Sequence, residues 1–326
     1  MTPLREPPPD PAKSPAEEPP ARRKRRRSNL RHRLEHALLR AALKTLELLP
    51  GGAATGFGRG TARLYFRLSR SRARILRENL TRAFPEKSAA EIRRIARDCA
   101  GNLGAAFMEF LESSWLTRED ILSRVGLAGE EHFAAARARG KGVFLLSAHF
   151  GSWELGAIRA GLISEPISSV VRPLDNPLLE RELADRRTRL GNRVIAKKDA
   201  AREILRAIRK KETVAILVDQ NVLAEEAVFV PFFGRPAATT PSLALFQIKT
   251  DAAVVPVFTW PLGGGRYRLQ FEKPILADEF GTDREGREDR VRKATERYMA
   301  VTEKAVRGEP AAWLWMHNRW RTRPGD

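Results

Sequence analysis

The chain has 326 residues, 42% of them hydrophobic, and a formal net charge of +19. This composition suits one large globular domain, or one domain with a helical appendage, and excludes a disordered protein. The single cysteine, Cys99, excludes an intramolecular disulfide and a multi-cysteine zinc site. None of the five histidines has a metal-ligand spacing, so we expect no metal. The charge predicts a polyanionic partner: nucleic acid, an anionic membrane, a phosphorylated substrate or an acidic carrier protein.

Residues 1–33 are predicted to form a disordered extension rich in proline and arginine, because residues 1–21 are rich in proline and lack hydrophobic periodicity. The extension contains six consecutive basic residues at 22–27. Such a run is typical either of a nucleic-acid-binding arm or of a polybasic patch that faces anionic lipid.

Residues 34–60 are predicted to form an amphipathic helix that associates with a membrane. Leu and Ala dominate its first half, while polar side chains recur every three or four residues at His36, Arg40, Lys44 and Glu47. A spanning helix needs about 20 apolar residues, and no such window exists in the chain. An ordinary helix on the domain surface is the alternative, and the neighbouring basic run favours the membrane.

Residues 61–326 are predicted to form the main domain. Helical patterns at 61–83 and 88–110 precede short apolar runs that alternate with further helical patterns. This order predicts an α/β fold with a central, mostly parallel or mixed sheet flanked by helices, behind a helical N-terminal layer. Strands are expected at 142–148, 166–171, 213–219, 252–259 and 266–272, and helices near 153–163, 176–190, 199–211, 240–250 and 286–307.

His149 is the first candidate for chemistry. It follows a buried apolar strand and enters a small-residue turn, with Glu154 five residues on in the next helix. This places His149 at the carboxyl end of a strand, where open α/β sheets bind their ligands. The spacing alone favours a catalytic base and a packed core histidine equally.

Basic and polar residues follow two other predicted strands. Arg172 comes directly after the second strand, and Asp219 lies at the tip of the third. Guanidinium groups bind phosphate oxygens in a bidentate manner, so this edge suits a phosphorylated substrate beside a general base. Arg186 and Arg189 are predicted to lie on a solvated charged face.

The nucleophile and nucleotide motifs of several enzyme classes are missing. The chain has no Gly-x-Ser-x-Gly elbow, no Walker loop, and no Gly-x-Gly-x-x-Gly after a strand. Gly263–Gly265 lies between two strands and predicts a hairpin turn. The remaining chemistry is direct transfer of an activated group to a hydroxyl or amine, assisted by one base.

Four separated segments resemble the lauroyl and myristoyl transferase family of lipid A biosynthesis, which belongs to the lysophospholipid-type acyltransferases. These segments are 77–86, the His-x4-acid motif at 149–154, 228–240 and 310–324. The resemblance implies a glycerolphosphate-acyltransferase-like fold, with His149 as general base and Glu154 orienting it. It also implies functional roles for Arg187 and Asp219.

The resemblance implies that an acyl chain moves from a thioester to a hydroxyl of a phosphorylated glycolipid, most simply a lipid A precursor. The expected donor is acyl carrier protein, with acyl-CoA as the alternative, and no cofactor is expected. Anionic membrane lipids are the other expected partner. The family usually has an N-terminal hydrophobic anchor, whereas the polar stripe here indicates peripheral or monotopic attachment at the cytoplasmic face of the bacterial inner membrane.

Individual roles follow as hypotheses from this reading. Arg172 and Arg187 would bind phosphate, and Asp219 would position one of these arginines. The side chains of Phe229, Phe232 and Phe233 are candidates for the acyl-chain groove, with core packing as the alternative. The tail tryptophans, Trp313, Trp315 and Trp320, would lie at the lipid headgroups or pack on the core.

Two other functions stay open. A different acceptor, such as a phosphatidylinositol mannoside or another lysolipid, fits the same residues. A basic nucleic-acid-binding protein accounts for the charge but gives the strand-end histidine no role, and no recognised nucleic-acid-binding module is present, so we expect no nucleic acid.

Overall fold

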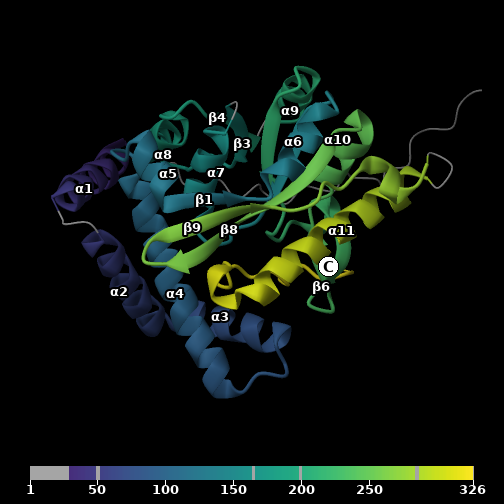
Figure 1. Cartoon of the computed structure of the whole chain (residues 1–326). Helices are drawn as coiled ribbons and strands as arrows, with labels where there is room; N and C mark the ends of the chain where they lie inside the picture. Colours follow the sequence, from purple (N-terminus) through teal and green to yellow (C-terminus); the bar gives the residue numbers. More distant parts are fainter. Residues whose placement is uncertain (1–28, 49–51, 164–165, 198–199, 283–285, 326) are drawn as a thin grey trace, which may run out of the picture.

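The computed structural model describes residues 29–48, 52–163, 166–197, 200–282 and 286–325. Within them, a central sheet is covered by helices on both faces (Figure 1). The strands are β1 (Val125–Ala128), β2 (Val143–Ser147), β3 (Ile167–Val171), β4 (Arg193–Ala196), β5 (Thr213–Leu217), β6 (Val228–Phe232), β7 (Arg235–Thr239), β8 (Ala253–Gly263) and β9 (Arg266–Phe271).

The helices divide into an N-terminal layer and a set that alternates with the strands (Figure 1). The N-terminal layer comprises α1 (Asn29–Glu47), α2 (Ala53–Leu68), α3 (Arg70–Ala83) and α4 (Ala89–Glu112). The others are α5 (Arg118–Arg124), α6 (Glu130–Ala138), α7 (Trp153–Gly161), α8 (Pro177–Thr188), α9 (Ala200–Arg209), α10 (Ser242–Thr250) and α11 (Arg287–Gly308).

The seven-stranded sheet has the order β1-β9-β8-β2-β5-β3-β4. All of its pairings are parallel except that of β8 with β9, which the predicted turn at Gly263–Gly265 joins as an antiparallel hairpin. The predicted α/β fold with a mixed sheet and a helical N-terminal layer is therefore confirmed. The strands β1 and β4 were not predicted, because four residues are too few to show a periodicity.

Strand β2 lies in the middle of this sheet and is buried on both faces. Phe144 and Leu146 belong to one hydrophobic cluster, whereas Val143 and Leu145 belong to the cluster on the opposite face. Successive side chains of a strand point to opposite faces, so a continuous apolar run is what a strand buried on both sides requires. This burial holds the residues that follow β2 at a fixed place on the sheet edge.

The single helix predicted over residues 34–60 is wrong. The structure has two helices there, α1 and the first half of α2, and the sequence between them contains Pro50, which favours a helix boundary. The helix predicted over 61–83 is likewise divided at Ser69. Most of the predicted disordered extension lies outside the described residues, but α1 begins at Asn29, so the last residues of that segment are helical.

Two residues of the polar stripe of α1 contact α8. His36 Nε2 lies 3.1 Å from Glu182 Oε2, and Arg40 Nη1 lies 3.6 Å from Glu182 Oε1, whereas Lys44 and Glu47 are exposed. Leu43 and Leu46 are also buried, in a small cluster with Ala54 of α2. The leucines at positions 30, 34 and 38 remain exposed on the outside of the helix.

Helices α2 and α4 cross at two glycines. A Cβ atom built on Gly104 would lie 2.0 Å from the carbonyl oxygen of Gly58, and one on Gly58 would lie 2.5 Å from that of Gly104. Neither backbone can give way without moving its helix. These glycines therefore set how closely the N-terminal layer packs.

We expect Gly104→Ala to lower the free energy of unfolding by roughly 1–3 kcal/mol, because the added methyl group overpacks the crossing. Gly60→Ala is the matched control, since Gly60 lies in α2 with open space around it. It should be neutral or stabilising by about 0.5–1 kcal/mol through its higher helix propensity. Urea unfolding measures both, and equal effects at the two sites would contradict the close crossing.

Candidate active site

His149 lies where it was predicted, in the loop after β2 at the carboxyl edge of the parallel strands. The loop then turns through Gly151, whose φ of +60° and close approach to β8 exclude other residues: an added Cβ would lie 1.8 Å from the carbonyl oxygen of Thr259. Trp153 begins α7, and its ring packs edge-on against the imidazole at 5.2 Å. His149 keeps 20% of its side chain exposed, so a substrate can reach it.

The carboxylate that orients His149 is Asp219. Its Oδ1 accepts a hydrogen bond from His149 Nδ1 at 2.9 Å, and its Oδ2 accepts from the backbone N–H of His149 at 2.9 Å. The indole Nε1 of Trp313 donates to the same Oδ2 at 2.8 Å. The expectations that Glu154 orients the imidazole and that Asp219 positions an arginine are therefore wrong. Because β2 and β5 are neighbours, Asp219 after β5 reaches His149, whereas Glu154 points to another helix.

The pKa values of Asp219 and His149 are shifted in opposite directions. Burial of Asp219 by itself would raise the pKa of its carboxyl, but His149 and the three hydrogen bonds lower that pKa to about 2. Burial would likewise lower the pKa of His149, but the charge and hydrogen bond of Asp219 outweigh it and raise the pKa above 6.5. The ionised carboxylate of Asp219 accepts a hydrogen bond from His149 Nδ1, so Nδ1 carries the proton of the neutral ring. The other ring nitrogen, Nε2, is therefore free to accept a proton.

Gln220 lies on the reactive side of the imidazole. Its side-chain Nε2 is 3.2 Å from His149 Nε2, where a hydroxyl that gives up its proton would bind. An amide N–H is a donor, so this contact agrees with an unprotonated Nε2. The sequence patterns by themselves give Gln220 no role.

Glu154 instead forms a bidentate ion pair with Arg187. The Nε and Nη2 atoms of Arg187 lie 3.0 Å and 2.6 Å from the two carboxylate oxygens of Glu154, and the guanidinium stacks over the ring of Phe110 at 5.3 Å. Burial lowers the pKa of Arg187 on its own, but Glu154 outweighs it and raises that pKa. The pair links the first turn of α7 to the last turn of α8 and neutralises much of the charge assigned to phosphate binding.

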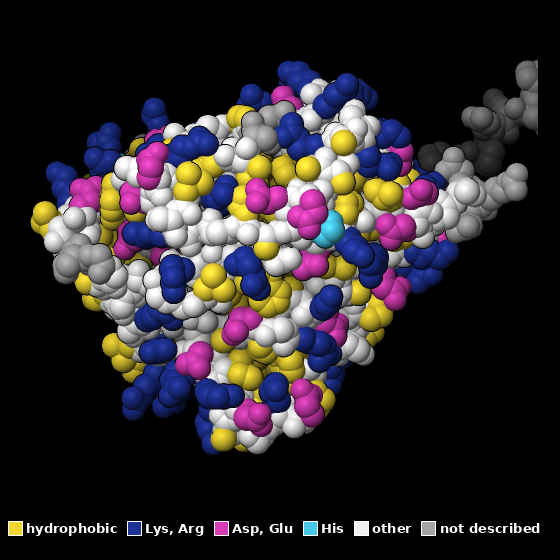
Figure 2. Space-filling view, viewed as in Figure 1, with side chains coloured by type: hydrophobic (Ala, Val, Ile, Leu, Met, Phe, Trp, Pro, Cys, Tyr) yellow, Lys and Arg dark blue, Asp and Glu magenta, His cyan; other side chains and the backbone are white. Residues whose placement is uncertain are grey.

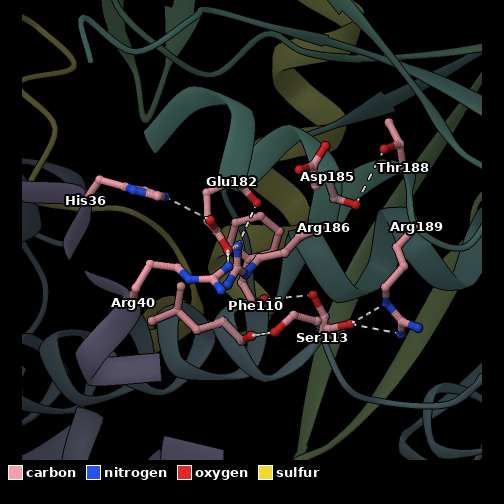
Figure 3. A network of polar contacts seen from close by, with 11 residues as sticks. His36, Arg40, Phe110, Ser113, Glu182, Asp185, Arg186, Thr188 and Arg189 are labelled. Carbon is pink, nitrogen blue, oxygen red and sulfur yellow. Dashed lines mark hydrogen bonds and ion pairs between the residues drawn. The ribbon is translucent and has the colours of Figure 1, made fainter. Parts of the chain in front are cut away.

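The other predicted arginines divide between surface and interior. Arg172 is exposed after β3, as a phosphate-binding role would require, and that role stays a prediction. Arg186 is only 4% exposed and donates to Glu182, and Arg189 donates to the carbonyl oxygen of Ser113 at 2.9 Å (Figure 3). The expected solvated face is therefore wrong for Arg186, which is buried against Glu182, whereas Arg189 is exposed as expected and also donates to the end of α4.

The predicted groove phenylalanines belong largely to the core. Phe232 is fully buried and packs against Trp313 and Trp320, and Phe233 is 6% exposed. Phe229 is half-buried, and its groove role stays a prediction. The predicted headgroup position of Trp313, Trp315 and Trp320 is wrong, since all three are buried.

The C-terminal tail forms one wall of the site. An isolated antiparallel bridge joins Phe150 to Trp313, and Asn79 of α3 donates to the carbonyl oxygens of Trp315 and His317, at 2.8 Å each. Cys99 is a packed thiol: it donates to the carbonyl oxygen of Trp313, and burial raises its pKa to about 12.

Sequence reasoning missed these positioning roles. Asn79 and Trp313 both lie inside segments that carry the family resemblance. Their place in these segments is the one sequence feature that could have indicated a role.

A small pocket of about 10 Å³ adjoins His149, Trp153 and Trp313, which is room for about one water molecule. No group of three or more His, Cys, Asp or Glu side chains that could hold a metal occurs in the described part of the chain. The site thus consists of an oriented base at a sheet edge, an amide beside it and an ion pair behind it.

Residues 22–322 match the family described as bacterial lipid A biosynthesis acyltransferase. The chain belongs to this family. It is 30% identical to the lipid A biosynthesis lauroyltransferase of Escherichia coli K12 over 271 residues, which covers 82% of this chain and 85% of the relative. It is 28% identical to a lipid A biosynthesis acyltransferase of Haemophilus influenzae, with 83% and 84% covered. A solved 1-acyl-sn-glycerophosphate acyltransferase of Thermotoga maritima overlays with a TM-score of 0.33 at 14% identity, covering 83% of this chain and 98% of that one.

We expect Asp219→Asn to lower kcat/KM by about 10²–10⁴-fold and to shift its acid limb to lower pH. The base must be neutral, so the rate falls as pH drops through the His149 pKa, which Asp219 raises above 6.5. Glu154→Gln is the matched control, because Glu154 contributes less to that pKa. A larger shift in Glu154→Gln than in Asp219→Asn would show that Glu154 orients the base.

Proposed function

We propose that this lipid A acyltransferase transfers a fatty acyl chain from a thioester to a hydroxyl of its glycolipid acceptor, and that His149 is the general base for this reaction. The observation that carries the proposal is the His149 and Asp219 pair, which leaves the exposed Nε2 ready to accept a proton. Family membership supports the reaction class and the glycolipid acceptor. The geometry around His149 and Asp219 supports the roles proposed for these two residues.

In this mechanism the acceptor hydroxyl binds at His149 Nε2, where Gln220 now lies. Its proton moves to Nε2 as its oxygen attacks the thioester carbonyl, and the thiol leaves with the proton that His149 returns. Asp219 holds the ring and stabilises the imidazolium. The Gln220 amide, which lies 3.2 Å from His149 Nε2, is proposed to donate to the carbonyl oxygen as negative charge develops there.

The proposed donor is acyl carrier protein, and the proposed acceptor is a phosphorylated lipid A precursor. The support for both is charge, because a chain with +19 attracts an acidic carrier and an anionic glycolipid alike. Arg172, exposed beyond β3, is the proposed phosphate contact on the same edge of the sheet as His149. Pairing with Glu154 gives Arg187 a positioning role between α7 and α8.

The proposed location is the cytoplasmic face of the inner membrane, with α1 and α2 lying in the lipid interface. Leu30, Leu34 and Leu38 recur every four residues on one face of α1 and are 77%, 59% and 63% exposed. Phe57 of α2 is 59% exposed. Figure 2 shows Lys and Arg side chains spread over this face of the molecule, with hydrophobic and acidic side chains between them. Among the described helices, none combines the length and apolarity needed to cross a bilayer.

We expect His149→Ala to lower kcat/KM by about 10²–10⁴-fold in a protein that still folds, because the general base is lost while the backbone N–H of residue 149 and the Trp313 indole still bond Asp219. Mass spectrometry of membrane lipids from cells with and without the wild-type chain should show one acyl chain gained on a lipid A precursor. A gain on a phosphatidylinositol mannoside or another lysolipid would reassign the acceptor. Full activity in a folded His149→Ala protein would contradict the mechanism.

We expect a Leu34→Glu, Leu38→Glu double variant to bind anionic vesicles more than about 10²-fold more weakly, since each buried leucine contributes about 1.5–3 kcal/mol. The control is Leu34→Met, Leu38→Met, which keeps the apolar surface at the same positions. Vesicle cosedimentation measures the affinity. Equal binding by the two double variants would show that α1 does not contact the membrane.

A further inference from the structure

A second pocket, of about 500 Å³, lies away from His149 at the junction of α3, α11 and the turn between β6 and β7. Its lining includes Arg82, Glu86, Phe233, Arg235 and Arg307. The pocket lies between two of the segments that carry the family resemblance, 77–86 and 228–240. A volume of this size accommodates a small polar headgroup.

Cations outnumber acids in the lining, with three arginines against one glutamate. Arg82 is only loosely paired, since its Nη2 lies 3.5 Å from Glu78 Oε2 on an exposed surface. Arg235 is exposed and has no acidic partner among the described residues. Exposed pairs of this kind contribute little and exchange readily for a better anion.

Arg307 is held in place. Its guanidinium stacks over the ring of Phe233 at 4.4 Å, and its Nε donates to Glu303 Oε1 at 2.7 Å. The other oxygen of Glu303 accepts the backbone N–H of Phe233 at 2.6 Å. One carboxylate therefore ties the hairpin turn to the arginine and fixes the direction of its remaining N–H groups.

The turn itself is strained at Phe233. Phe233 has a φ of +51° and Gly234 one of +68°, as in a two-residue turn that favours Asn-Gly. A bulky residue at positive φ costs free energy and persists only where its surroundings hold it. Here the ring is held between Phe84 at 5.2 Å and Trp315 at 5.6 Å, beneath the guanidinium of Arg307.

We propose that this pocket binds a phosphate ester. Guanidinium forks bind phosphate oxygens in a bidentate manner, and Arg82, Arg235 and Arg307 approach the same space from three different elements. Trp313 and Trp315, whose ring centroids are 4.6 Å apart, lie between Phe233 and Asp219, so the pocket shares no side chain with the reacting groups. Binding there does not require acyl transfer to occur.

The test is arginine labelling of the full-length protein with phenylglyoxal, followed by peptide mass spectrometry. Glycerol 3-phosphate at about ten times its Kd should slow labelling of Arg235 about tenfold, because a bound ligand blocks the reagent in proportion to occupancy. Exposed Arg209 of α9 should label at an unchanged rate. Sodium chloride at equal ionic strength should protect neither residue.

A second arm distinguishes the source of the phosphate. Protection by soluble glycerol 3-phosphate indicates a free ester, and protection only by vesicles containing phosphatidic acid, not by vesicles with diacylglycerol in its place, indicates a lipid headgroup. Arg307→Gln should weaken either protection at least tenfold, whereas Arg209→Gln should leave it unchanged. Absence of protection in both arms, or equal protection of Arg209, would overturn the proposal.

Discussion

The buried carboxylate of Asp219 is the constraint on which the rest of the site depends. A charge with 2% of its side chain exposed is tolerated only when it is fully hydrogen-bonded, and its donors come from two other segments: the loop after β2 and the C-terminal tail. Satisfying the carboxylate therefore fixes three parts of the chain against each other. The same bonds set the tautomer of His149 and keep Nε2 as the acceptor.

The tail has to be held in turn, because Trp313 positions Asp219 only if its own backbone is fixed. Side chains of α3 and α4 do this: Asn79 and Cys99 donate to tail carbonyl oxygens, and Asn102 donates to that of Ala311 at 3.1 Å. The polar side of the tail is satisfied as well, since the neutral His317 accepts the N–H of Asn221 and burial lowers its pKa to about 4. The N-terminal layer thus supports the active site from the side opposite the sheet.

The N-terminal helical layer also contacts α8 through polar side chains of α1. His36 and Arg40, two residues of the stripe that indicated an interfacial helix, pair with Glu182 of α8, and the leucines at positions 30, 34 and 38 of α1 stay exposed. The helix that carries Arg187 and the helix proposed for the membrane are therefore in direct contact. Arg187, paired with Glu154, connects α8 to the helix that follows His149.

Local patterns in the sequence determined the strand before His149, the glycine turn after it, and most of the alternating helices and strands, because periodicity and turn chemistry act over a few residues. They could not show which acid meets His149. Glu154 is five residues away but points to α8 from the first turn of α7, whereas Asp219 is 70 residues away and adjacent in space. Only the pairing of β2 with β5 brings Asp219 to the ring, because a sheet aligns strand ends whatever their separation along the chain.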